Sequence, residues 1–217
     1  FSIGVCYNQL AGAGIQAILE QADVAMYHVK KNGKGHFIVY DEIREQIEEE
    51  RAIKERALSG MVWQEIAILY RPVIYLQTSF VVSVETVIQW IFPDKGMIAE
   101  EKFMPIFKQY GIDVDMSAYV LEEVCKQKYR WRNTKFDNME IYVRLCGRYV
   151  LQSGSIQAVM QCMDKYGLRR DEVELCIEEK DFGENGERMY GVVHGLMDAG
   201  FKVAINNFAS ASSLSVL

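Results

Sequence analysis

The sequence predicts an α/β protein whose later part is built on parallel strands. Strand-like runs begin near residues 139, 172 and 201, and helical patterns separate them. A repeat of about thirty residues is typical of β–α–β units, in which a helix crosses back between parallel strands. Half of the 217 residues are hydrophobic, which is enough for a substantial core. In such folds we expect functional side chains at the carboxyl ends of the strands.

Residues 1–41 predict a strand, a helix and a second strand. Residues 2–5 (SIGV) suit a strand, and residues 15–29 repeat apolar side chains at helical spacing. A basic last turn and Gly33 then end the helix. Residues 36–41 alternate like a closing strand.

Residues 42–62 predict a charged helical linker. Acids and bases surround Ile43, Ile47 and Ile53 in this part of the chain. Such a run of charges usually forms a solvated helix face, so we assign it as a connector. The predicted organisation is 1–41, the linker 42–62, and a larger domain over 63–217.

The larger domain opens with a predicted hairpin and continues with alternating helices and strands. The hairpin pairs residues 66–76 with 80–90, and two helices follow, the second of which places Lys128 on its apolar face. Further strands are predicted at 139–146, 172–179 and 201–208. Five strands are fewer than the eight that close a barrel, so we expect an incomplete barrel with an open edge. A longer parent chain or a partner chain would cover that edge.

Composition excludes several functional classes. The net charge of −6 gives no electrostatic footprint for duplex nucleic acid. No run approaches eighteen apolar residues, so no membrane segment is predicted here, although the parent chain could be anchored upstream. Five scattered cysteines favour reduced thiols and a cytoplasmic location. The three scattered histidines give no zinc spacing.

Motifs in residues 65–217 resemble the EAL family of cyclic di-GMP phosphodiesterases. These motifs are ILYRPVIYL, VETVIQW, YVRLC, VELCIEE and INNFASASSLSVL, in the family's order. The last keeps the family's Ser-Ser-Leu at residues 212–214. The resemblance implies an incomplete TIM-type barrel of the EAL kind.

The same resemblance implies that most metal-binding positions are changed. The retained acids are Glu85 and Glu179, whereas the family's asparagine, second glutamate and two aspartates become Arg144, Cys176, Asn206 and Asn207. The arginine that contacts the dinucleotide phosphate falls at Gln89, and Arg71 lies in the first motif. Arg71 and Gln89 are therefore candidate nucleotide-binding positions.

These substitutions predict that Mg²⁺ or Mn²⁺ is no longer bound. Two-metal hydrolysis needs hard oxygen ligands of high negative charge. The family supplies four carboxylates, whereas Glu85, Arg144 and a protonated Cys176 sum to zero here. At an effective dielectric of about 20, each lost pair of unit charges at ~4 Å is worth about 4 kcal/mol. We therefore expect no catalytic residues and no metal cofactor.

Each changed position also has a purely structural interpretation. Cys176 suits a small core residue, with a zinc ligand beside Cys146 as the alternative. Asn206 and Asn207 could cap the loop that follows them. Arg144 in an apolar strand needs a partner, for which the resemblance suggests Glu85 or Glu179.

The segment ADVAMYHVKKNGKGHFIVYD and the preceding strand resemble the last third of a GGDEF diguanylate cyclase domain. The resemblance places Lys30 where the family's lysine approaches a nucleotide phosphate. The alternative is a solvated lysine at a helix C-terminus, where the helix dipole favours it. The loop that names the family would precede residue 1.

Taken together, the sequence predicts a non-catalytic cyclic di-GMP signalling module. It would act through a protein partner or homodimer, or as a weak receptor for the dinucleotide. The alternatives are a phosphodiesterase with a rebuilt site, a cyclase acting through an upstream GGDEF domain, and a purely structural role in dimerisation.

Overall fold

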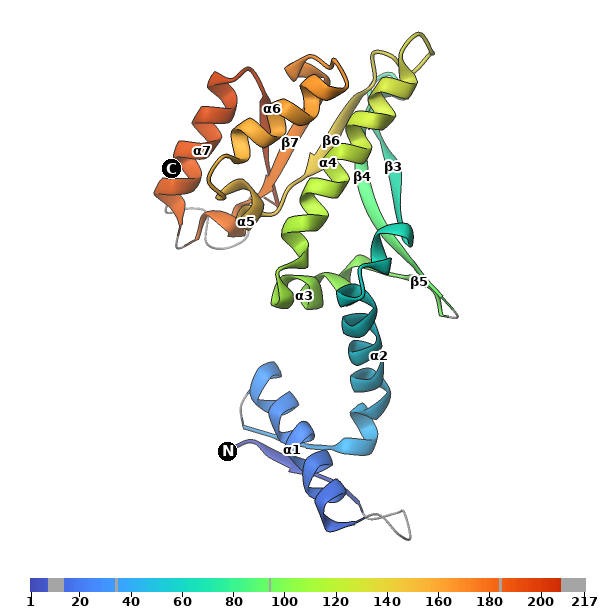
Figure 1. The fold of residues 1–217 in the computed structure, drawn as a ribbon, viewed down its shortest axis with the longest axis vertical. Helices are drawn as coiled ribbons and strands as arrows, with labels where there is room; N and C mark the ends of the chain where they lie inside the picture. Colours follow the sequence, from blue (N-terminus) through green and yellow to red (C-terminus); the bar gives the residue numbers. More distant parts are fainter. Residues whose placement is uncertain (8–13, 34, 94, 184, 208–217) are drawn as a thin grey trace. The chain divides into compact units, whose positions relative to one another are not determined.

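The computed structural model describes residues 1–7, 14–33, 35–93, 95–183 and 185–207 (Figure 1). The chain divides into two compact units, Phe1–Met61 and Val62–Leu217. The predicted Ser-Ser-Leu motif at 212–214 lies outside the described residues. Each unit is considered by itself below.

The first unit is a short strand–helix–strand arrangement followed by a long helix. Strand β1 (Ile3–Val5) pairs in parallel with β2 (Phe37–Val39), and α1 (Ile15–Asn32) connects them. The predicted order of these elements is confirmed. The predicted second strand was too long, because helix α2 (Tyr40–Leu58) begins directly after Val39.

Gly4 allows α1 to lie directly against β1. A Cβ atom on Gly4 would come within 2.0 Å of the Ala22 carbonyl oxygen and 2.3 Å of the Met26 nitrogen. Only glycine permits so close an approach of two backbones. Beside this contact, Ala25 and Val29 are completely buried.

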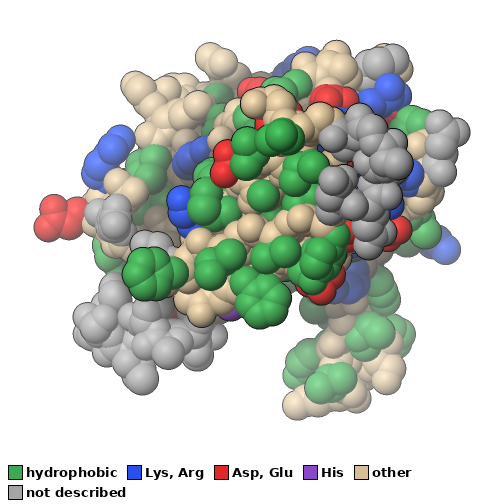
Figure 2. All heavy atoms as spheres, turned by 90° about the horizontal axis from the view of Figure 1, so that it is seen from below, with side chains coloured by type: hydrophobic (Ala, Val, Ile, Leu, Met, Phe, Trp, Pro, Cys, Tyr) green, Lys and Arg blue, Asp and Glu red, His purple; other side chains and the backbone are tan. Residues whose placement is uncertain are grey.

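The apolar face predicted for α1 is buried only in part. Ile15 and Leu19 are 77% and 56% exposed. The physical reason is length, because strands of three residues span about 10 Å and a helix of eighteen residues spans about 27 Å. Other large apolar residues of this unit, such as Ile3 and Phe37, are also exposed. Figure 2 views the molecule from below, and apolar side chains (green) gather on the face that is visible there.

The second unit is built on one sheet in the strand order β3-β4-β6-β7-β8. Strands β3 (Ile66–Tyr75) and β4 (Phe80–Phe92) form the predicted antiparallel hairpin. The short strand β5 (Gly96–Ile98), which the sequence did not suggest, also pairs with β4. Strands β6 (Glu140–Arg144), β7 (Val173–Glu178) and β8 (Lys202–Asn206) then add in parallel. The predicted alternation of strands and helices is therefore present.

Helices fill the connections and cover one face of this sheet (Figure 1). Helices α3 (Glu100–Tyr110) and α4 (Ile112–Trp131) lead to β6, whereas α5 (Gly147–Val150) and α6 (Ser155–Lys165) lead to β7. Helix α7 (Gly186–Asp198) precedes β8. Short 3-10 helices complete the unit: η1 (Met61–Gln64), η2 (Arg170–Glu172) and η3 (Glu179–Phe182).

Strand alternation divides the sheet into a core face and an opposite face. On β6 and β7, the fully buried side chains are Ile141, Val143, Val173, Leu175 and Ile177. The alternate positions on β6 and β7 point to the opposite face and include Arg144 and Cys176, which are register partners. Because successive side chains alternate between faces, the polar candidates are separated from the main core.

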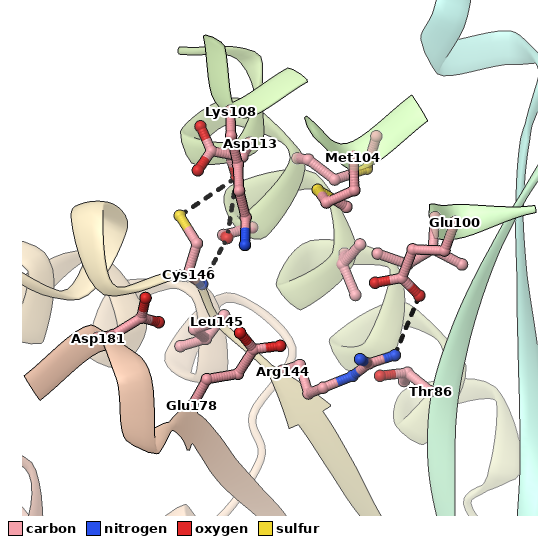
Figure 3. A pocket seen from close by; sticks show the side chains of 14 residues that line it. Thr86, Glu100, Met104, Lys108, Asp113, Arg144, Leu145, Cys146, Glu178 and Asp181 are labelled. Carbon is pink, nitrogen blue, oxygen red and sulfur yellow. Dashed lines mark hydrogen bonds and ion pairs between the residues drawn. The ribbon is translucent and has the colours of Figure 1, made fainter. Parts of the chain in front are cut away.

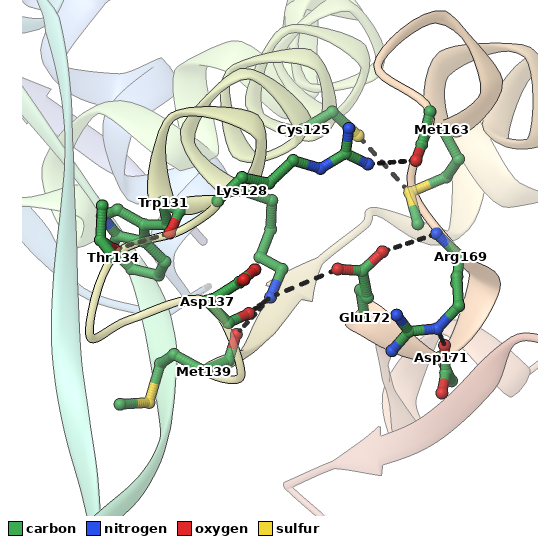
Figure 4. A network of polar contacts seen from close by, with 12 residues as sticks. Cys125, Lys128, Trp131, Thr134, Asp137, Met139, Met163, Arg169, Asp171 and Glu172 are labelled. Atoms are coloured by element: carbon green, nitrogen blue, oxygen red, sulfur yellow. Dashed lines mark hydrogen bonds and ion pairs between the residues drawn. The ribbon is translucent and has the colours of Figure 1, made fainter.

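Lys128 anchors the end of α4 to the segments that lead into β6 and β7 (Figure 4). Its ammonium group donates hydrogen bonds of 2.8 Å to the carbonyl oxygens of Asp137 and Met139. It also lies 3.8 Å from Glu172. Lys128 is only 2% exposed. A lysine on an apolar helix face is thus accommodated because acceptors surround its charged end.

Within the described residues, no helix combines the length and apolar character that crossing a membrane requires.

Candidate functional site

The sheet register brings most of the predicted site residues onto one face. Glu85 on β4 is the register partner of Tyr142 on β6, two residues before Arg144. Arg144 pairs in register with Cys176, and Cys176 with Ala204, two residues before Asn206. Because strand side chains repeat with a period of two residues, Glu85, Arg144, Cys176 and Asn206 share this face.

Arg144 lies between two carboxylates. Its Nε atom is 3.8 Å from Oε1 of Glu85, so the predicted pairing with this residue is present. Its Nη2 atom is closer, at 3.1 Å, to Oε2 of Glu100. All three side chains are between 21% and 25% exposed, so water screens these pairs only in part.

Glu85 has a second cationic partner in Arg71. The two residues face each other across the hairpin, and Nη2 of Arg71 donates a 2.6 Å hydrogen bond to Oε2 of Glu85. Two arginines and two glutamates thus alternate along Arg71, Glu85, Arg144 and Glu100. The negative charge of the retained glutamate is balanced by guanidinium groups.

Glu100 is a partner that the sequence motifs did not indicate. It is the first residue of α3, where an acidic side chain suits the positive end of the helix dipole. Its approach to Arg144 depends on how the α3 and β6 backbones pack, which no local pattern encodes.

Cys176 is a buried thiol on β7. It is 8% exposed, and burial, followed by the negative charges of Glu174 and Glu85, raises its pKa to about 12. The side chain is therefore a neutral thiol at pH 7 and not a thiolate. Cys146, its possible partner in a zinc site, instead brings its Sγ atom to 3.4 Å from the Asp113 carbonyl oxygen.

Asn206 ends the last described strand, and Asn207 follows it. Asn207 has a φ of 58°, in the left-handed region that asparagine tolerates better than most residues. Its backbone N–H donates a 2.9 Å hydrogen bond to Oδ1 of Asn206. This contact gives Asn206 a local turn-forming role.

A cleft of about 690 Å³ opens beside the charge network. Its lining includes Arg71, Gln89, Arg144 and Asn207, which are four of the predicted site residues. Lys108 of α3 and Lys180 of η3 add positive charge, while Glu100, Glu101 and Glu178 add negative charge. The cleft is therefore polar and of mixed sign.

Glu178, rather than Glu179, lines this cleft. Burial opposes ionisation of Glu178, but the hydrogen bond and positive charge of Lys180 outweigh it and lower the pKa of the carboxyl group. Glu179 begins η3 and lines neither this cleft nor the smaller cavity beside it.

The smaller cavity, of about 50 Å³, lies between the end of β6 and helices α3 and α4 (Figure 3). Its wall is well hydrogen-bonded: Oγ of Ser117 accepts from the Cys146 N–H at 3.0 Å and donates to the Asp113 carbonyl at 3.0 Å. Across the cavity, Asp181 accepts a 2.9 Å hydrogen bond from the Gly147 N–H. Burial raises the pKa of Asp181 against this hydrogen bond.

The remaining candidate, Lys30, belongs to the first unit. It lies in the last turn of α1 and is exposed.

The positions that the family resemblance relates to metal ligands hold a mixed set of donors. One carboxylate is already paired with two guanidinium groups, and a neutral thiol and two amides complete the set. Among the described residues, no three His, Cys, Asp or Glu side chains are grouped so that they could hold a metal ion. Two-metal hydrolysis uses several hard oxygen ligands of high negative charge, and these positions supply one carboxylate and two amides.

Comparisons with known proteins place the chain in a family. The EAL domain family matches residues 55–217. The cyclic di-GMP phosphodiesterase PdeR of Escherichia coli is 25% identical over 218 aligned positions, which cover all of this chain and 33% of PdeR. The bifunctional diguanylate cyclase/cyclic di-GMP phosphodiesterase MucR of Pseudomonas aeruginosa is 21% identical and covers 98% of this chain and 31% of MucR. This chain thus spans about a third of the length of these relatives.

Solved structures show the same fold. The PaMucR phosphodiesterase in complex with c-di-GMP superposes with a TM-score of 0.67 at 20% identity, over 75% of this chain and 64% of that one. Structural neighbours of this chain are therefore EAL domains with an α/β fold. Because the family match covers most of the sequence, including every strand of the second unit, the chain belongs to the EAL domain family of cyclic di-GMP signalling proteins.

Proposed function

We propose that the EAL domain of this protein is a non-catalytic module of cyclic di-GMP signalling. The observation that carries this proposal is the position of Arg144, whose guanidinium lies between Glu85 and Glu100 at a former metal-ligand position. An arginine supplies fixed positive charge where the catalytic chemistry of the family needs cations that can bind and activate water.

Charge arithmetic over the changed positions supports the proposal. Glu85 contributes −1 and Arg144 contributes +1, while Cys176 is neutral because its pKa is raised to about 12. Asn206 and Asn207 add no charge. A divalent ion would therefore meet a site of zero net charge and would also have to displace a guanidinium.

The competing function is cyclic di-GMP hydrolysis, the activity for which the relatives PdeR and PaMucR phosphodiesterase are named. The two functions differ in a direct assay. The full-length protein is incubated with cyclic di-GMP and Mn²⁺, and linear dinucleotide is measured by chromatography. We expect none above the level of a Glu85→Ala variant. Mn²⁺-dependent product that this variant loses would establish the competing function.

Restoring the missing ligands gives a matched positive test. The variant carries Arg144→Asn, Cys176→Glu, Asn206→Asp and Asn207→Asp, so that three new carboxylates join Glu85 and the set again contains four. We expect Mn²⁺ binding by titration calorimetry in this variant and not in the natural sequence, with both proteins showing the same circular dichroism. Equal Mn²⁺ affinity in both would contradict the charge argument.

The proposed module responds to its surroundings by contact with a protein partner or a second copy, or by weak binding of cyclic di-GMP in the 690 Å³ cleft. Arg71 supports the second mode, because its side chain is 65% exposed and its guanidinium retains N–H groups for a phosphate. Calorimetry with cyclic di-GMP tests it, and we expect a Kd weaker than about 10 µM. Sedimentation of the full-length protein tests self-association.

We also propose that residues 1–41 are the end of a GGDEF domain. The alignment with the bifunctional MucR supports this, since it extends over 98% of this chain and so includes most of the first unit. An intact Gly-Gly-Asp-Glu-Phe or Gly-Gly-Glu-Glu-Phe sequence upstream would make cyclase activity of the parent protein testable with GTP and Mg²⁺.

A further inference from the structure

Two cysteine thiols from different helices lie in contact behind the sheet. Sγ of Cys125 on α4 and Sγ of Cys162 on α6 are 3.6 Å apart. Cys125 is completely buried, whereas Cys162 is partly accessible to solvent. In sequence the two residues are 37 positions apart and in no recognisable motif, so only the packing of α4 on α6 brings them together.

The surroundings hold this pair in place. One turn away on both helices, Nζ of Lys165 forms a 2.7 Å ion pair with Oε1 of Glu122. The Tyr166 hydroxyl donates to the same Glu122 oxygen at 3.0 Å. On the inner side, Sγ of Cys125 lies 3.5 Å from Sδ of Met163, which is completely buried (Figure 4). The two helices are therefore fixed in the register that juxtaposes the thiols.

We propose that Cys125 and Cys162 are an oxidative modification site, at which a peroxide converts the two thiols into a disulfide that links α4 to α6. The sulfur atoms must approach by about 1.5 Å to reach the S–S bond length of ~2.05 Å. Rotation about the side-chain bonds of two neighbouring helices supplies movements of that size.

The two thiols have different roles in this reaction. The hydrogen bond between Cys162 and Cys125, together with Lys165 and Lys126, lowers the pKa of the Cys162 thiol against burial and the negative charge of Glu122. The same hydrogen bond and burial raise the pKa of Cys125. Cys162 is thus the partly exposed thiol that ionises more readily and meets the oxidant, and Cys125 is the buried thiol that resolves the product.

Atoms and electrons balance over two steps. The Cys162 thiolate attacks one oxygen of hydrogen peroxide, the O–O bond breaks, and hydroxide leaves while sulfenic acid forms on Cys162. The Cys125 sulfur then attacks the Cys162 sulfur, its thiol proton is transferred to the departing hydroxyl group, and water leaves. Two thiols are oxidised by two electrons, and one peroxide is reduced to two waters.

The link would also fix the scaffold of the small cavity. Helix α4 holds Ser117 against the Cys146 N–H. Joining α4 to α6 therefore restrains the helix that forms one wall of the site. This inference does not depend on whether the EAL domain is catalytic.

Trypsin separates every cysteine onto its own peptide, which makes the test direct. Cys125 falls in peptide 109–126, Cys162 in 149–165 and Cys146 in 145–148. The native full-length protein is treated with hydrogen peroxide, free thiols are blocked with iodoacetamide, and the digest is read by mass spectrometry without reduction. We expect peptide 109–126 linked to 149–165, and loss of this species after dithiothreitol.

Thermal unfolding supplies a second readout. We expect oxidation to raise Tm by about 5–10 °C, because the link closes a loop of 37 residues in the unfolded chain. The Cys162→Ser variant should lose both the linked peptide and the shift. The matched Cys146→Ser variant should keep both. Recovery of Cys162 as sulfinic acid with Cys125 unmodified, or a link from Cys162 to peptide 145–148, would overturn the proposal.

Discussion

The Nη2 atom of Arg144, the last residue of β6, lies 3.1 Å from Oε2 of Glu100, the first residue of α3. This ion pair joins a strand end to a helix start across the mouth of the candidate site. Glu85 approaches the same guanidinium at 3.8 Å. One cation therefore compensates two acids that are otherwise close together.

We expect Arg144→Met to destabilise the second unit by about 1–2 kcal/mol. Methionine leaves Glu85 and Glu100 near each other without the shared cation, but partial exposure and the remaining Arg71 reduce the penalty. Urea unfolding measures the change. The control is Arg169→Met, which removes an ion pair to Asp171 whose partners are 74% and 55% exposed and should cost less than about 0.5 kcal/mol. Equal midpoints for the two variants would contradict the prediction.

Gln89→Arg should strengthen binding of cyclic di-GMP by about 10- to 100-fold. Gln89 lines the large cleft together with Arg71, so an arginine there adds a charge-assisted hydrogen bond to a phosphate. Calorimetry measures the affinity at fixed salt. Gln127→Arg makes the same charge change beside Tyr70 and Tyr119, in a different cavity, and should leave the affinity unchanged. A similar gain in both variants would indicate a non-specific charge effect.

The sequence predicted the elements of the fold better than their detailed contacts. Alternation in β3 and β4 and the repeat from β6 to β8 identified the sheet, because local periodicity follows directly from which face is buried. The strand β5 was missed because its three residues are too few to show a period. Similarly, β2 was predicted to be too long, because Tyr40 and Asp41 fit a strand pattern and a helix start equally well.

For the candidate site too, the sequence predicted the positions of residues better than their contacts. The motifs placed Glu85, Arg144 and Cys176 on neighbouring strands, and the register puts them on one face. The partners Glu100 and Arg71 were not foreseen as parts of one charge network, because they reach Arg144 and Glu85 only through tertiary packing and hairpin pairing. Cys125 and Cys162 illustrate the limit most clearly, since nothing in sequence relates them.

Gly147→Ala should destabilise the protein by about 1–3 kcal/mol. A Cβ atom at this position would lie 2.6 Å from Cβ and 2.8 Å from Cγ of Asp181, so the hydrogen bond from the Gly147 N–H to Asp181 must break or stretch. Chemical denaturation measures the cost. Gly191→Ala in α7 is the control, because its Cβ meets no atom within 4 Å and should stabilise the helix by about 0.5–1 kcal/mol. Loss of stability in both variants would remove the steric explanation.

Lys128→Met should destabilise the second unit by about 2–3 kcal/mol near pH 7, because two part-buried carbonyl groups lose their donor. The pH dependence is more diagnostic. Burial lowers the pKa of Lys128 below 10.5, although Glu172 and Asp137 oppose the shift. Between the folded pKa and the unfolded value near 10.4, the unfolded chain binds more protons at this residue. Lys128 therefore makes the folded state more stable as pH rises through that window. The hydrogen bonds can persist, because a neutral amine still carries two N–H groups for the carbonyl oxygens of Asp137 and Met139.

The neighbouring Lys126 supplies a control of opposite sign. The hydrogen bond from Lys126 to Glu123 raises the pKa of Lys126. Its contribution to the free energy of unfolding is therefore complete below the pKa of the unfolded state and is lost as pH rises through the pKa of the folded state. Unfolding free energies of the natural protein, Lys128→Met and Lys126→Met are compared from pH 7 into the alkaline range. As pH rises, the difference in unfolding free energy between the natural protein and Lys128→Met should widen. The difference between the natural protein and Lys126→Met should narrow. Parallel curves for the two variants would mean that burial does not shift the Lys128 titration, and the anchoring of α4 would then rest on hydrogen bonds alone.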